Sequence, residues 1–123
     1  MNNRMWNIKN PHQGKRKKVL CVCSAGLLRS PTVAWILSND PFGFNTRAAG
    51  IDADHALIPV DEALLGWADE IVFVERSVAD RALSMFDLTG MIFNVLDLPD
   101  QFAFRDPELV AIATEQLKEA FNE

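Results

Sequence analysis

The chain has 123 residues, 49% of them hydrophobic, which suits one packed domain and is too apolar for a disordered chain. No apolar stretch reaches the ~18 residues of a membrane span, and the N-terminus has no apolar core followed by a small-residue cleavage site. The only cysteines, Cys21 and Cys23, are poorly placed along one strand to bridge, so we expect a cytoplasmic protein with reduced thiols.

Basic residues gather at the N-terminus. Residues 1–18 hold six lysines and arginines and no acid, whereas residues 19–123 carry a net charge of −11. We interpret residues 1–17 as a solvated, poorly ordered arm and residues 18–123 as the folded domain. The arm could meet nucleic acid or an acidic partner, but the acidic domain argues against a broad nucleic-acid surface.

The first half of the domain predicts two strands, each followed by a helix. Residues 19–23 form a short apolar run typical of a strand buried on both faces. Ser30 can cap the next helix, with Pro31 at the favoured first position, and an Asn-Asp-Pro sequence ends it. A weaker strand follows at 44–49. Residues 60–67 then predict a short helix with acids in its first turn.

The second half repeats this alternation. Residues 71–74 are another apolar strand, and Ser77 with Asp80 resembles a capping box that opens a helix. Residues 91–96 predict the last strand, and an Asp-Pro-Glu sequence opens a final helix within residues 106–121.

The order β-α-β-α-β-α-β-α predicts an α/β fold. We expect a single-domain three-layer sandwich, with a four-stranded parallel sheet flanked by helices on both faces. In such sheets ligands bind beyond the carboxyl ends of the strands. The turn after Cys23 and the stretch after Leu96 both lie at that edge.

The turn after the first strand, Val22-Cys23-Ser24-Ala25-Gly26-Leu27-Leu28-Arg29-Ser30-Pro31-Thr32, favours a phosphate site. Cys23 stands where a helix N-terminus and a nearby cation favour the thiolate, the form that acts as a nucleophile. Arg29 can bind two phosphate oxygens at once, and Ser30 can donate its hydroxyl to the thiolate. The backbone amides assigned to the bound oxyanion belong to Ser24, Ala25, Gly26, Leu27 and Leu28. The alternative is a plain strand–turn–helix junction with a buried structural cysteine.

This turn resembles the signature V-C-x-G-N-x-C-R-S-P of the low-molecular-weight protein tyrosine phosphatases. Residues 47–50 are similar to the family's S-A-G segment, and residues 67–74 to its third strand. The resemblance implies hydrolysis through a phosphocysteine intermediate, with no metal or other cofactor. It also implies a phosphorylated protein or a small phosphomonoester as substrate. Leu28 stands where the family has a second loop cysteine, and Gly26 where it has asparagine.

The resemblance further implies an aspartate after the fourth strand as general acid. The only literal Asp-Pro is Asp106-Pro107, which we interpret as a helix start. Asp97 directly follows the strand and is our first choice, with Asp100 as the alternative.

Other functions fit the same loop. A non-hydrolytic phosphoryl carrier would share the cysteine, but it needs no arginine, so Arg29 followed by Ser-Pro favours hydrolysis. A phosphate- or phosphopeptide-binding module would lack the general acid. Arsenate reduction would require further cysteines, and none follows Cys23.

Overall fold

The fold follows the predicted alternation of strands and helices. The structure, a computed structural model, describes residues 17–24, 29–52, 54, 56, 58–98 and 106–121. Its elements are β1 (Lys18–Cys23), α2 (Arg29–Ser38), β2 (Asn45–Gly50), α3 (Glu62–Trp67), β3 (Glu70–Phe73), α4 (Arg76–Met85), β4 (Ile92–Val95) and α5 (Pro107–Phe121). Of the predicted arm at residues 1–17, residues 1–16 lie outside the described residues, and Lys17 forms an ion pair with Glu70 of β3. None of the described helices is long and apolar enough to span a membrane.

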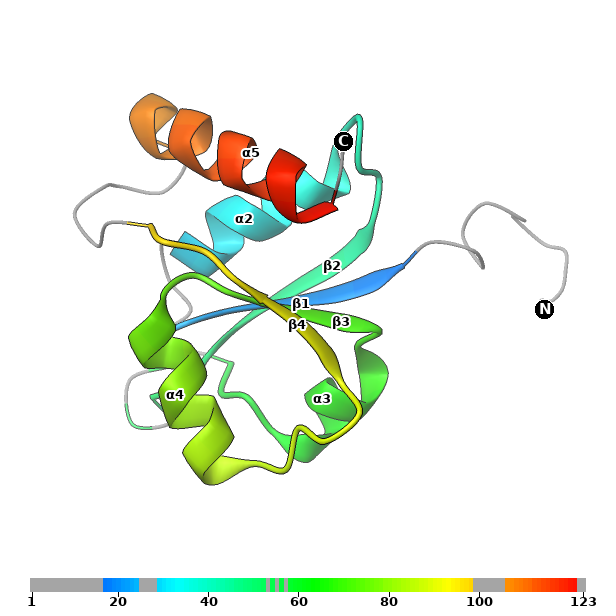
Figure 1. The fold of residues 1–123 in the computed structure, drawn as a ribbon, viewed down its shortest axis with the longest axis vertical. Helices are drawn as coiled ribbons and strands as arrows, with labels where there is room; N and C mark the ends of the chain where they lie inside the picture. Colours follow the sequence, from blue (N-terminus) through cyan, green and yellow to red (C-terminus); the bar gives the residue numbers. More distant parts are fainter. Residues whose placement is uncertain are drawn as a thin grey trace, which may run out of the picture.

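The sheet is parallel, with the strand order β2-β1-β3-β4. Helices α2 and α5 cover one face and α3 and α4 the other, as Figure 1 shows. The predicted three-layer α/β sandwich is therefore confirmed. Strand β1 has β2 on one side and β3 on the other, so the connections diverge at its carboxyl end. Such a switch point is where open α/β sheets bind ligands.

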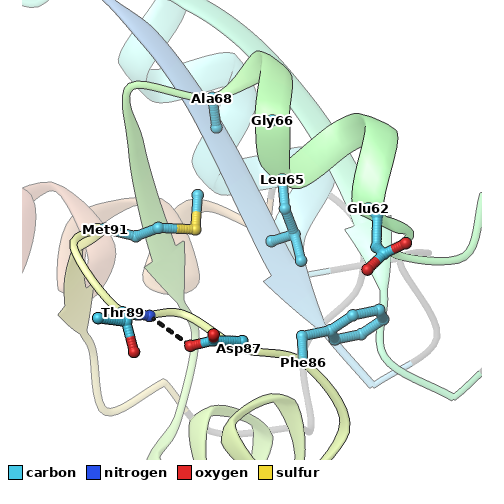
Figure 2. A pocket seen from close by; sticks show the side chains of 8 residues that line it. All are labelled: Glu62, Leu65, Gly66, Ala68, Phe86, Asp87, Thr89 and Met91. Carbon is cyan, nitrogen blue, oxygen red and sulfur yellow. Dashed lines mark hydrogen bonds between the residues drawn. The ribbon is translucent and has the colours of Figure 1, made fainter.

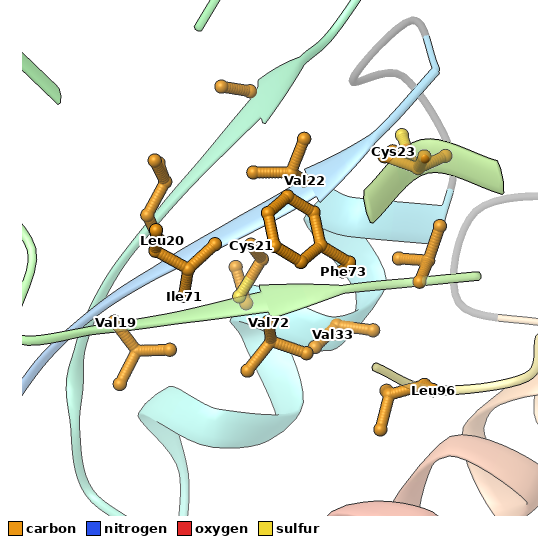
Figure 3. Close-up of a cluster of buried hydrophobic side chains, with 14 of the residues drawn as sticks. Val19, Leu20, Cys21, Val22, Cys23, Val33, Ile71, Val72, Phe73 and Leu96 are labelled. Atoms are coloured by element: carbon orange, nitrogen blue, oxygen red, sulfur yellow. The ribbon is translucent and has the colours of Figure 1, made fainter. Parts of the chain in front are cut away.

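The core is built on the two central strands. All of β3 and every residue of β1 after Lys18 are buried, because helices cover both faces of a parallel sheet. Figure 3 shows their side chains packed together, with Phe73 of β3 beside Val22, its partner in β1, and Val33 of α2 nearby. Helix α5 adds Leu109, Ala113 and Leu117, spaced by one helical turn each.

One helix start confirms the sequence prediction, and another differs from it: the helix predicted from residue 60 begins at Glu62, so Asp61 is its N-cap and not part of its first turn. The Asp61 carboxylate accepts a hydrogen bond from the Leu64 N–H at 2.8 Å and caps α3. The Asp106 carboxylate accepts one from the Glu108 N–H at 2.9 Å, directly before Pro107 opens α5. Asp106 is thus used at a helix N-terminus, as we interpreted it.

Two other helix starts differ from the prediction. Helix α4 begins at Arg76 after Glu75, so the capping box at Ser77 is wrong: the Ser77 hydroxyl bonds to the Glu75 carboxylate inside the first turn. Helix α2 begins at Arg29, so Ser30 is not its N-cap. The Ser30 hydroxyl instead contacts the Cys23 thiol and the carbonyl oxygen of Ala49 on β2.

Candidate active site

Cys23 and Ser30 meet where β1 ends and α2 begins. The Cys23 Sγ lies 3.1 Å from the Ser30 Oγ, within hydrogen-bond distance, and both residues are buried. The Ser30 hydroxyl also reaches the carbonyl oxygen of Ala49 on β2 at 3.4 Å. The predicted thiol–hydroxyl pair is therefore present, at the carboxyl edge of the sheet.

Arg29 lies beside this pair and is almost fully buried, with 3% of its surface exposed. Its Nη1 donates to the Glu75 Oε1 at 2.5 Å and to the carbonyl oxygen of Leu98 at 3.1 Å. A buried guanidinium is stable only when such partners replace the water that it loses. The start of α2 and the segments that follow β3 and β4 thus converge on one side chain.

Glu75 contacts the candidate site through Arg29 and was not predicted from the sequence. It follows β3 at the same edge as Cys23, one residue before α4. The Arg29 guanidinium holds the pKa of the Glu75 carboxyl below its usual value; burial opposes this shift and the Ser77 hydroxyl adds to it. The sequence did contain a signal for Glu75: an acid that directly follows a fully apolar strand lies at the carboxyl end of the sheet, where ligands bind.

Cys21 is separate from this chemistry. It is fully buried in β1, and burial raises the pKa of its thiol far above the ordinary range, with Cys23 adding to the effect. The Cys21 thiol therefore stays protonated and serves as a packing residue.

Asp97 lies two residues after the end of β4. Its N–H donates to the Gln116 Oε1 at 2.7 Å, and the Gln116 Nε2 donates to its carbonyl oxygen at 3.0 Å. The next residue, Leu98, supplies the carbonyl that Arg29 binds. Asp97 is exposed, and its role as general acid stays a prediction.

The other predicted site residues are only partly described. Ala25, Gly26, Leu27, Leu28 and Asp100 lie outside the described residues. Ser24 is described, and its carbonyl accepts from the Asp52 N–H at 2.8 Å.

Two cavities flank the described part of the chain. One, of about 420 Å³, lies between α3 and the connection from α4 to β4, where Figure 2 shows Leu65, Phe86 and Met91 around it. Because α3 leads into the start of β3 and Met91 precedes β4, this cavity lies at the amino ends of the strands, whereas Cys23 lies at their carboxyl ends. The other, of about 730 Å³, runs beside β4 and includes Asp97 in its lining.

Comparisons with known proteins agree with this architecture. No protein-family model and no curated protein sequence matches the chain. Among solved structures, it is similar to a YwlE mutant from Bacillus subtilis, with 20% sequence identity and a TM-score of 0.56 over 87% of this chain and 99% of that one. YwlE is a low-molecular-weight protein tyrosine phosphatase. The chain therefore has a divergent form of the fold of the low-molecular-weight protein tyrosine phosphatases.

Proposed function

We propose that this protein is a phosphomonoester hydrolase that acts through a phosphocysteine intermediate, with protein phosphotyrosine as the favoured substrate. The observation that carries the proposal is the contact between Cys23 and Ser30 in the same turn as the buried Arg29. The similarity of the fold to that of a tyrosine phosphatase supports it.

In the first step the Cys23 thiolate attacks phosphorus, and the bond from phosphorus to the leaving oxygen breaks. Ser30 stabilises the thiolate through its hydroxyl, 3.1 Å away. Arg29, held in orientation by Glu75, binds the equatorial oxygens together with the loop amides. Asp97, or alternatively Asp100, gives its proton to the leaving oxygen.

In the second step water attacks the thiophosphate. The same aspartate, now ionised, takes a proton from that water as the new oxygen–phosphorus bond forms. The sulfur–phosphorus bond breaks, its electron pair returns to Cys23, and inorganic phosphate leaves. The cycle thus needs only water and the phosphomonoester.

Replacing the nucleophile tests this mechanism. We expect Cys23→Ser to abolish turnover of 4-nitrophenyl phosphate while leaving vanadate binding in place, because the loop and Arg29 remain. Cys21→Ala is the matched control, since the buried Cys21 is not used, and should stay active. Full activity in Cys23→Ser would rule the mechanism out. Many turnovers per wild-type molecule would exclude a phosphoryl carrier.

A further inference from the structure

A groove runs along the open edge of the sheet. Strand β4 pairs with β3 alone among the described strands, so its other edge has no strand beside it. The cavity of about 730 Å³ lies along this edge. Its lining comes from α4, β4 with the two residues after it, and α5: Arg76, Asn94, Val95, Leu96, Asp97, Gln116, Glu119 and Ala120. Figure 1 shows β4 running between α4 and α5.

The hydrogen bonds of β4 show which backbone groups face this groove. The Leu96 N–H donates to the Phe73 carbonyl at 2.8 Å, so the backbone groups of Leu96 point toward β3. Successive residues of an extended strand direct these groups to opposite edges. The N–H and C=O of Val95 and Asp97 therefore point outward, toward the groove. An outward strand edge is a template for pairing with another chain.

The Gln116 side chain already binds the outward backbone groups of Asp97, as a peptide group of a neighbouring strand would. Its carboxamide accepts from the Asp97 N–H and donates to the Asp97 C=O. Two bonds to one residue are what a residue in an antiparallel neighbouring strand would make. The edge thus accommodates amide groups beside it, and the next outward residue, Val95, faces the groove itself.

The groove also reaches the candidate active site. Arg76, in its lining, follows Glu75, and Asp97 precedes Leu98. Glu75 and Leu98 are the two partners of the Arg29 Nη1. A chain lying in the groove would therefore leave it beside the residues that hold the phosphate-binding arginine.

We propose that an extended segment of the phosphorylated substrate protein pairs with the outer edge of β4 at Val95 and thereby presents its phosphorylated residue to Cys23. This inference rests on the proposed phosphatase function and names its substrate as an extended phosphopeptide segment. From β1 across β3 and β4 to a paired chain is three strand spacings, about 14 Å. At about 3.3 Å per extended residue, the phosphorylated residue lies about four or five residues from the paired stretch.

Phosphotyrosine peptides of graded length test the proposal. One series is lengthened on the N-terminal side of the phosphotyrosine and another on the C-terminal side, each from about two to about eight residues. We expect kcat/KM to rise about tenfold in one series once the arm passes about six residues, because only then does backbone pairing begin. N-methylation of the backbone in the distal residues should remove this rise, since it deletes the donors while keeping the side chains.

A groove-filling variant supplies the second arm of the test. Ala120→Trp places a bulky side chain in the groove, whereas Ala111→Trp places the same side chain on an exposed part of α5 outside the groove lining. We expect Ala120→Trp to abolish the gain with long peptides and to leave turnover of 4-nitrophenyl phosphate unchanged. Ala111→Trp should retain both.

The outcomes separate this proposal from the one on which it rests. Turnover of 4-nitrophenyl phosphate without any dependence on peptide length overturns the docking groove alone. A length effect that survives both N-methylation and Ala120→Trp also overturns it. So does a dimer in ultracentrifugation that Ala120→Trp dissociates, because a second copy of the chain would then occupy the β4 edge. If neither the small ester nor any peptide is hydrolysed, both proposals fail.

Discussion

At the scale of single residues, the candidate site depends on how one buried guanidinium is paired. Arg29 is 3% exposed and contacts a carboxylate and a carbonyl through one nitrogen. Removing one partner of a buried ion pair is costly because the other charge stays buried. Glu75 thus stabilises the fold around Arg29 and orients its guanidinium, the group that binds phosphate in the proposed mechanism.

Glu75→Gln should lower phosphatase activity while leaving the proposed nucleophile, Cys23, in place. Hydrogen bonds to charged groups contribute about 1.5–3 kcal/mol, so we expect a loss of about tenfold or more in kcat/KM for 4-nitrophenyl phosphate. Asp80→Asn is the control, because Asp80 forms an exposed ion pair with Arg76 at 3.2 Å, and exposed pairs contribute little. Equal losses in the two variants would contradict a specific role of Glu75.

The same residue predicts a pH dependence of stability. The folded-state pKa of Glu75 lies below its ordinary value of 4.5, so the ionised carboxylate stabilises the fold above about pH 4.5. This contribution is lost as the pH falls through the folded-state pKa. Urea unfolding of wild type and Glu75→Gln should therefore give a gap in unfolding free energy at pH 7 that narrows at pH 3.5. A gap that is constant with pH would show that Glu75 acts through packing alone.

Comparing esters with poor and with activated leaving groups identifies which aspartate is the general acid. A proton donor contributes about 10²–10⁴-fold for a poor leaving group and little for an activated one. We expect Asp97→Asn to slow phenyl phosphate hydrolysis by that range and to spare 2,4-dinitrophenyl phosphate. Asp100→Asn should leave both rates near wild type. The reverse pattern would assign the acid to Asp100. If each variant changed the hydrolysis rates of both esters equally, neither aspartate would be the general acid.

At the scale of elements, short helices hold the strand ends in place. Helix α3 has only six residues and depends on its Asp61 cap, because a single turn forms poorly alone. Gly66 lies within it and borders the cavity of Figure 2. An added Cβ at Gly66 would meet no atom within 4 Å, and the residue has no positive φ. Packing therefore does not require glycine there.

Gly66→Ala should stabilise the protein. Alanine is favoured over glycine inside a helix by about 0.5–1 kcal/mol, and the structure leaves room for its methyl group. Gly90→Ala is the matched comparison: Gly90 has φ of 82°, so alanine there should destabilise the turn before β4. Urea unfolding measures both, and a destabilised Gly66→Ala would contradict the described conformation of α3.

At the scale of the whole molecule, the sheet brings three distant segments to one edge. The Arg29–Glu75 and Arg29–Leu98 bonds join residues 46 and 69 positions apart. A ligand that binds only this assembled edge stabilises the entire fold, because the unfolded chain has no such site.

Inorganic phosphate or vanadate should therefore raise Tm. At ten times Kd the stabilisation is about 1.4 kcal/mol, which corresponds to several degrees for a domain of this size. Arg29→Lys should lose most of the rise, since lysine cannot bind two oxygens in the same fork. Sodium chloride at matched ionic strength controls for general salt effects, because chloride lacks the tetrahedral oxygens that the arginine fork would bind. A rise that persists unchanged in Arg29→Lys would place the anion elsewhere.

The sequence alone determined the order of elements and pointed to the loop that carries the proposed nucleophile. Apolar periodicity and helix-start residues such as Asp106 are local signals, readable without knowing which strands pair. Cys23, Arg29 and Ser30 lie within eight consecutive residues, so one strand–turn–helix unit brings them together. The exact first residues of α2 and α4 were harder to predict from the sequence, because the Ser30 and Ser77 hydroxyls make other contacts instead of capping a helix.

Only the tertiary structure decided what surrounds that loop. Glu75 meets Arg29 because β3 lies beside β1, and Leu98 reaches it because β4 follows β3 in the sheet. Gln116 binds Asp97 because α5 crosses back over the end of β4. The same strand order leaves β4 with an open edge and a groove. Such contacts depend on strand order and helix direction, which local patterns of residues do not encode.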